Sequence, residues 1–87
     1  MASYNVVFRP SVEKDLAALP KAIAVRALAR IEKLAESPFA TALKLSGAEK
    51  LYRVRVRDYR IVYEIDEASK LIVIHYVRHR RDVYRNL

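Results

Sequence analysis

Residues 51–65 read LYRVRVRDYRIVYEI, and this stretch decides the fold. Apolar and basic side chains alternate along its first half, which is typical of a β-strand with one buried and one exposed face. A polar break at Arg57 and Asp58 separates this strand from a second β-rich run, so the pattern predicts a β-hairpin. The core-facing side chains of its first strand are Tyr52, Val54 and Val56, and those of the opposite face are Arg53 and Arg55.

The turn of this hairpin decides which side chains face each other. With Arg57 and Asp58 as a two-residue turn, Arg55 lies directly opposite Arg60. Opposed like charges are unfavourable unless an anion lies among them, so this pairing indicates phosphate binding. A solvated polar face without a partner is the alternative. Such turns favour φ > 0 at glycine, asparagine or aspartate, so Arg57 predicts either mild strain or a longer turn.

Two helices are predicted after an N-terminal strand at residues 4–9. Pro10 stops the strand and Ser11 is the predicted N-cap of the first helix. Pro20 ends that helix and opens the second, because proline disrupts a helix interior but suits a first turn. The second helix ends at Ser37 and Pro38. Its apolar stripe consists of Ile23, Ala27, Leu28, Ile31, Leu34 and Ala35, with Arg26, Arg30 and Lys33 on the far side.

The rest of the chain supplies a loop, the hairpin and a third strand. The loop at residues 39–50 contains a short extended piece at Leu43–Leu45, and the strands are expected at residues 51–56, 59–65 and 71–77. A polar tail follows, with a helical turn around residues 82–85. The predicted fold class is α+β, in the order β-α-α-β-β-β, with a helical hairpin on one face of a mainly antiparallel sheet. The other face is left open.

Length and composition limit the classes of function. A chain of 87 residues has room for one modest core, so residues 1–87 are expected to form a single domain. Its 17 Lys and Arg against 10 Asp and Glu give a net charge of +7, which favours a polyanionic partner. With no cysteine and two histidines, neither a metal site nor a cofactor is expected. No apolar run approaches the ~20 residues that span a bilayer, so we expect a cytoplasmic protein without membrane contact.

The hairpin residues and the later stretch Val77–Tyr84, VRHRRDVY, resemble the RelE family of toxins within the RelE/ParE superfamily. The segment Leu43–Gly47 resembles the one that precedes the hairpin in that family. The resemblance implies the toxin of a type II toxin–antitoxin system, an endoribonuclease that enters the ribosome and cleaves messenger RNA in the A site without a metal. The 2′-hydroxyl attacks the adjacent phosphate. A cognate antitoxin, the ribosome and messenger RNA are the implied partners.

The resemblance also implies a catalytic set. It consists of Arg53, Arg55, Arg60, Arg78 and Tyr84. The first three are expected to hold the scissile phosphate, Arg78 to support the leaving oxygen, and Tyr84 to orient or accept the attacking proton. Further RNA contacts are expected from Lys44, Lys50, Arg57, His79, Arg80 and Arg81.

Two departures from the family pattern affect the chemistry. Arg57 stands where glycine is usual, and Arg53 and Arg55 stand where the best-known member has lysine. Arginine stays protonated and is a poor general base, so the identity of the base is open. Tyr84 is one candidate, and His79 is the other, because histidine is the side-chain type that most often serves as a general base. His75, within an apolar strand, is interpreted as a hydrogen-bonded packing residue.

Two other functions fit the same sequence. A ParE-like inhibitor of DNA gyrase would share the scaffold, because fold does not settle function. It has no need of the arginines and Tyr84 together. A non-catalytic RNA-binding module would use the same basic face to hold a phosphate backbone without cutting it.

Overall fold

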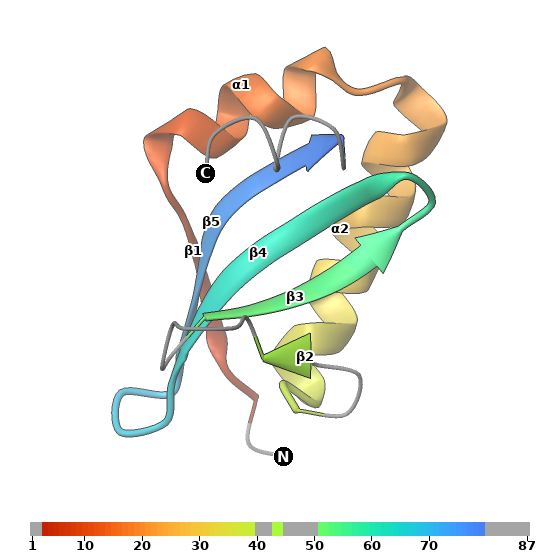
Figure 1. Ribbon diagram of the computed structural model, residues 1–87. Helices are drawn as coiled ribbons and strands as arrows, with labels where there is room; N and C mark the ends of the chain where they lie inside the picture. The colour runs from red at the N-terminus through yellow and green to blue at the C-terminus, as the bar shows by residue number, and fades with distance from the viewer. Residues whose placement is uncertain (1–2, 40–42, 45–50, 80–87) are drawn as a thin grey trace.

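The computed structural model describes residues 3–39, 43–44 and 51–79, and it has the predicted α+β fold (Figure 1). The elements are β1 (Asn5–Phe8), α1 (Pro10–Ala18), α2 (Lys21–Glu36), β2 (Leu43–Lys44), β3 (Leu51–Val56), β4 (Tyr59–Asp66) and β5 (Leu71–His79). The predicted order β-α-α-β-β-β is confirmed, and β2 falls within the extended piece expected at Leu43–Leu45. In the described part of the chain, no helix is long and apolar enough to cross a membrane.

The strands form one five-stranded sheet in the order β1-β5-β4-β3-β2. The pair β1 and β5 is parallel and the other three pairs are antiparallel, so the sheet is mainly antiparallel as predicted. In Figure 1, α2 runs behind β3 and β4 while α1 crosses near the end of β5. Both helices contribute buried residues to one core with the same face of the sheet.

That core explains the apolar pattern of the strands. Every second residue of β3 and β4 faces the helices. The buried core consists of Val12 from α1, Ala27, Ile31 and Leu34 from α2, and Val54, Val56, Ile61, Tyr63, Ile65, Ile72, Ile74 and Val77 from the strands. Tyr52, Leu16 and Leu19 are packed against it. Burying each large aliphatic side chain stabilises the fold by roughly 1.5–3 kcal/mol.

Two details of the helices differ from the prediction. The N-cap of α1 is Arg9, not Ser11, and it makes no side-chain capping hydrogen bond. Pro10 occupies the first turn instead, where its missing N–H leaves no donor unsatisfied and its fixed φ suits the helix. Pro20 is the N-cap of α2, immediately before the helix. Leu28, predicted in the buried stripe, is 42% exposed and borders an open apolar groove.

The hairpin register is confirmed: Val56 pairs with Tyr59, and Arg55 pairs with Arg60. Of the two turn residues, Arg57 has φ of 58° and Asp58 does not have positive φ. A positive φ at the first turn position alone matches the pattern of a type II′ turn, in which glycine is usual there. Of the two interpretations of Arg57, strain in a short turn is therefore the correct one.

Strand β5 contains a bulge that the alternation of its sequence does not predict. Tyr63 pairs with Ile74, whereas Val62 pairs with Tyr76, so His75 has no Cα partner on β4. A bulge inserts one residue and shifts the alternation of the strand beyond it. Ile72 and Ile74 face the core before the bulge, and Val77 faces it after the bulge.

Beyond the bulge, β5 is longer than the predicted strand at residues 71–77. Arg78 and His79 extend it because they pair with Arg60 and Tyr59 at the start of β4. Strand β4 likewise extends by one residue to Asp66, which pairs with Leu71. Both strands therefore extend beyond the apolar residues that predicted them, because antiparallel pairing continues to the polar residues at their ends.

Candidate functional site

Three arginines lie in register across three neighbouring strands. Arg55 of β3 pairs with Arg60 of β4, and Arg60 pairs with Arg78 of β5. By the alternation of each strand, all three lie on the opposite face from the core residues Val56, Ile61 and Val77. Neighbouring strands are about 4.8 Å apart, so the three backbones span roughly 10 Å. We call these three residues the arginine row. Three arginines on adjacent strands bring several positive charges to one face of the sheet, which favours the binding of an anion.

The face that carries the arginine row is not bare, which corrects the expectation of an open face. Arg60 is only 7% exposed and Val62, one step along β4, is only 2% exposed. Arg55 is exposed and Arg78 is half-buried. Arg53 pairs with Val62 on the same face, and its Nε is buried without a hydrogen-bond partner in the described part of the chain. Arg60, and in part Arg53 and Arg78, are therefore removed from water, and charge interactions are stronger in such surroundings than in water.

Tyr76 belongs to the same face and was missed by the sequence reasoning. It pairs with Val62, and the guanidinium carbon of Arg78 lies 4.9 Å from the centre of its ring. Burial raises the pKa of the Tyr76 hydroxyl, and the charges of Arg78 and Arg60 offset part of that rise. The hydroxyl therefore stays protonated at neutral pH and can donate a hydrogen bond. The sequence did contain a signal for this: Tyr76 is two residues before Arg78 on the same strand, and residues at that spacing share a face.

Helix α1 holds the third member of the arginine row in place. The Nε of Arg78 lies 3.7 Å from Oδ1 of Asp15, and the N–H of Val77 donates a 3.1 Å hydrogen bond to Oδ2 of the same carboxylate. Strand β1 pairs with β5 only as far as Ile74 in the described residues, so the edge of β5 beyond it lacks a strand neighbour. Asp15 satisfies a backbone donor at this edge and fixes the end of β5.

The other site residues proposed from the sequence are not part of the arginine row. His79 pairs with Tyr59 on the opposite face from Arg60, with the two rings 5.2 Å apart and at 86°. Arg57 lies in the turn, and the backbone of Lys44 pairs with Tyr52. Tyr84, Lys50, Arg80, Arg81 and the helical turn expected around residues 82–85 lie outside the described residues.

His75, expected to be a hydrogen-bonded packing residue, is half-buried at the bulge. Its Nε2 lies 3.3 Å from a carboxylate oxygen of Glu64, and its Nδ1 lies 3.1 Å from a guanidinium nitrogen of Arg9. Both ring nitrogens therefore have a partner, and the expectation is confirmed. Within the described ranges, no cluster of three or more His, Asp or Glu side chains could hold a metal ion.

Comparison with known proteins gives a consistent result. The family model described as ParE toxin of type II toxin-antitoxin system, parDE, matches residues 6–84. A chain of an archaeal RelE–RelB complex from Pyrococcus horikoshii is 32% identical, with a TM-score of 0.77, and the match covers 90% of this chain and 96% of that chain.

Two further structures are similarly close. A RelB–RelE antitoxin–toxin complex from Methanococcus jannaschii contains a chain that is 28% identical, with a TM-score of 0.80 over 93% of this chain and 98% of that one. The toxin–antitoxin complex RelBE2 from Mycobacterium tuberculosis also gives 28% identity and a TM-score of 0.80, covering 90% of this chain and 99% of that chain.

Proposed function

Since the chain belongs to the ParE toxin family of type II toxin–antitoxin systems and is a RelE-type toxin, we propose that it is a ribosome-dependent endoribonuclease that cleaves messenger RNA in the A site. The observation that carries this proposal is the arginine row, with Arg55, Arg60 and Arg78 in register on one face. Phosphoryl transfer requires stabilisation of the charge that builds up on phosphate oxygens, and fixed guanidinium groups supply it.

In the proposed reaction, the 2′-hydroxyl oxygen of a nucleotide attacks the adjacent phosphorus and the 5′-oxygen of the next nucleotide leaves. The products are a 2′,3′-cyclic phosphate and a 5′-hydroxyl, so the proton lost by the 2′-hydroxyl is matched by one gained at the leaving oxygen. Arg55 and Arg60, with Arg53 one step away, hold the phosphate. Arg78 supports the leaving oxygen.

Two tyrosines complete the proposed chemistry. Tyr76 has a protonated hydroxyl on the same face as Arg60 and Arg78, and it donates a hydrogen bond to a phosphate oxygen. Tyr84 orients the 2′-hydroxyl or accepts its proton, as the resemblance implies. His79 is the weaker candidate for the base, because its ring packs on Tyr59 on the other face of the sheet.

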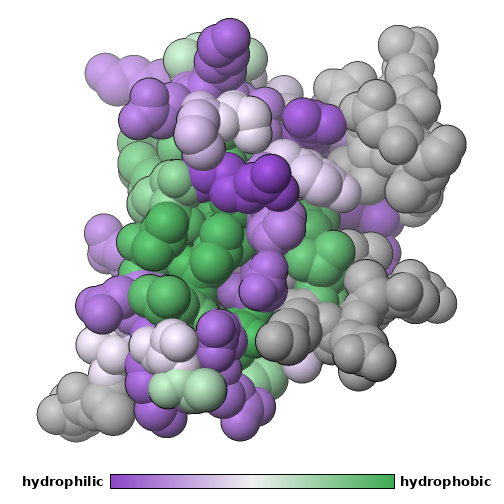
Figure 2. All heavy atoms as spheres, turned by 90° about the vertical axis from the view of Figure 1, so that its left-hand side faces the viewer, coloured by the Kyte–Doolittle hydropathy of each residue, from purple (hydrophilic) through white to green (hydrophobic). Residues whose placement is uncertain are grey.

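The partner that neutralises this activity is proposed to be a cognate antitoxin, as in the relatives solved as complexes with RelB. An apolar groove of about 500 Å³ beside β1 suits a protein partner, and Val6, Phe8, Leu28 and Ile31 are among its lining residues. Val7 and Phe8 are 46% and 39% exposed. Figure 2 looks onto the β1 side of the molecule, where apolar side chains gather between polar ones. Exposed apolar surface of this kind is typical of protein interfaces.

Primer extension on a message translated in vitro tests the cleavage proposal. Wild type is compared with Arg60→Ala and Tyr84→Phe, with naked RNA as the control. We expect cuts within A-site codons that require ribosomes and disappear with Arg60→Ala. Intact message with unaffected translation would refute the proposal and direct the next assay to gyrase supercoiling. Inhibited translation with intact message would instead identify a non-catalytic RNA-binding protein.

A further inference from the structure

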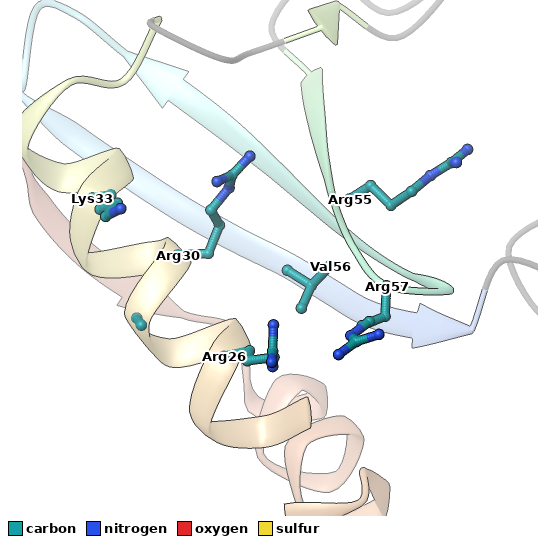
Figure 3. A pocket seen from close by; sticks show the side chains of 7 residues that line it. Arg26, Arg30, Lys33, Arg55, Val56 and Arg57 are labelled. Carbon is teal, nitrogen blue, oxygen red and sulfur yellow. The ribbon is translucent and has the colours of Figure 1, made fainter. Parts of the chain in front are cut away.

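A second basic site lies on the other side of β3, between the hairpin turn and α2. It is a groove of about 300 Å³ lined by Arg26, Ala29, Arg30, Lys33, Arg55, Val56 and Arg57 (Figure 3). Arg26 and Lys33 are exposed and Arg30 is half-buried, so these residues lie outside the buried stripe of α2, and the structure adds that they face the end of β3. In the described residues, β2 pairs only with Tyr52 and Arg53, so the end of β3 is a free edge that these helix residues can reach.

The charge of this groove is unbalanced. Five of its seven lining side chains are cationic and none is acidic. Within residues 3–39, 43–44 and 51–79, no acidic side chain forms an ion pair with any of these five. Like charges held this close repel one another, so the arrangement lowers stability until an anion enters.

Two further observations indicate a ligand. Arg30 is half-buried, and its Nε is buried without a hydrogen-bond partner in the described structure. Arg57 holds φ of 58° in the turn, and Figure 3 shows its side chain directed toward the same space as Arg26, while Arg55 extends away from the helix. Backbone strain and an unsatisfied buried donor both reduce stability, and both are characteristic of binding sites.

The spacing of the cations favours a chain of phosphates. Arg26, Arg30 and Lys33 stand at positions i, i+4 and i+7 of α2, so they follow one side of the helix over about 10 Å. Only Ala29 and Val56 are apolar in the lining, whereas protein partners are held mainly by apolar and aromatic anchors. A nucleic-acid backbone requires cations above all.

We propose that this groove binds the phosphodiester backbone of RNA as a second site, which shares only Arg55 with the arginine row. The inference rests on the proposed function in that ribosomal and messenger RNA are the polyanions this toxin would meet. The groove then anchors RNA on one side of β3 while the arginine row acts on the other side. Arg55 is the residue shared by the two sites.

The test measures binding of a fluorescent RNA duplex at several KCl concentrations. A duplex buries its base edges, so binding reports contacts to the backbone. The double variant Arg26→Gln/Lys33→Gln is compared with Lys14→Gln/Lys21→Gln, which removes the same charge from exposed positions outside the groove. The arginine row is intact in both variants.

We expect the groove variant to bind about tenfold more weakly at low salt, with a slope of log Kd against log [KCl] lower by roughly 1.4–1.8, or 0.7–0.9 for each lost contact. The control should change much less. Equal slopes in the two variants would overturn the inference. So would displacement of the duplex by poly-glutamate as effectively as by unlabelled RNA, because the groove would then favour an acidic protein. A wild type that fails to cut messages but shows the groove-dependent slope would overturn the proposed function and leave this inference standing.

Discussion

The arginine row and the cationic groove use the same residue type in two different environments. Arg60 in the row is almost completely buried, and Arg78 is held by Asp15 and packs against Tyr76. In the groove, Arg26 and Lys33 are exposed on α2, and no acidic side chain lines the space. Buried, oriented charges suit chemistry because they need no reorganisation, whereas exposed ones act mainly through long-range attraction. This difference predicts that mutations in the arginine row mainly lower the cleavage rate, whereas mutations in the groove mainly weaken RNA binding.

The largest expected effect is on catalysis. Arg78→Ala should reduce ribosome-dependent cleavage by about 100-fold, because one fixed donor to the developing charge is lost. Arg26→Ala should reduce it only a few-fold, and raising the RNA concentration should restore most of that loss. Single-turnover cleavage rates measured over a range of RNA concentrations separate the two cases. Equal losses in both variants at saturating RNA would contradict the division between the sites.

The next effect is on stability at the end of β5. Asp15→Ala should lower the free energy of unfolding by about 2 kcal/mol, because the buried N–H of Val77 loses its acceptor and Arg78 loses its carboxylate. Asp15→Asn keeps an oxygen acceptor and should lose less. Urea denaturation of the three proteins measures both changes. If the asparagine variant were as unstable as the alanine variant, the backbone hydrogen bond would not be the main contribution.

A smaller effect is expected in the hairpin turn. Arg57→Gly should raise the free energy of unfolding by about 1 kcal/mol, since glycine adopts φ of 58° without the strain of a side chain. The same variant should weaken binding of the RNA duplex, because a cation leaves the groove. Asp58→Gly is the matched control, and it should lower stability because Asp58 has no positive φ to relieve. A destabilised Arg57→Gly protein would show that the side chain makes contacts that outweigh the strain.

The smallest effect concerns Tyr63, whose hydroxyl is buried without a hydrogen-bond partner in the described residues. Burial, with a smaller contribution from Tyr52, raises the pKa of Tyr63 from 10.0 to about 12. The folded protein therefore holds this proton more tightly than the unfolded chain, and the resulting stability is present below pH 10 and lost as the pH rises through about 12. Tyr63→Phe should show a smaller fall in stability over this range in urea titrations. Identical falls in both proteins would exclude Tyr63 as the titrating group.

The sequence predicted the parts of the molecule that depend on local patterns. Alternation and a two-residue turn are enough to pair Arg55 with Arg60, because a hairpin register follows from its turn. The position of Arg78 opposite Arg60 does not follow in this way. Strict alternation from Ile72 and Ile74 would turn Arg78 toward the core, and only the bulge at His75 reverses it.

The N-cap of α1 and the cationic groove were not predicted either, because they too depend on neighbouring residues or elements. Ser11 has the side chain of an N-cap, but Pro10 already occupies the first turn of α1. The stripe of α2 separates apolar from basic residues, yet it carries no information about which strand edge lies beside the basic ones. The groove also depends on which part of the β3 edge is covered: in the described residues β2 pairs only with Tyr52 and Arg53, and a pattern within α2 does not reveal this.

The bulge at His75 also indicates where β5 can lose one residue without a change in which side chains face the core. Without His75, Ile74 would be followed directly by Tyr76, and regular alternation would keep Val77 facing the core and Arg78 facing the other way. At this point, a one-residue deletion leaves the faces of β5 unchanged. A one-residue deletion between Leu71 and Ile74 would instead shift the alternation on one side of the deletion and turn apolar side chains away from the core. His75 is thus the place where related chains can differ by one residue while preserving both the core and the arginine row.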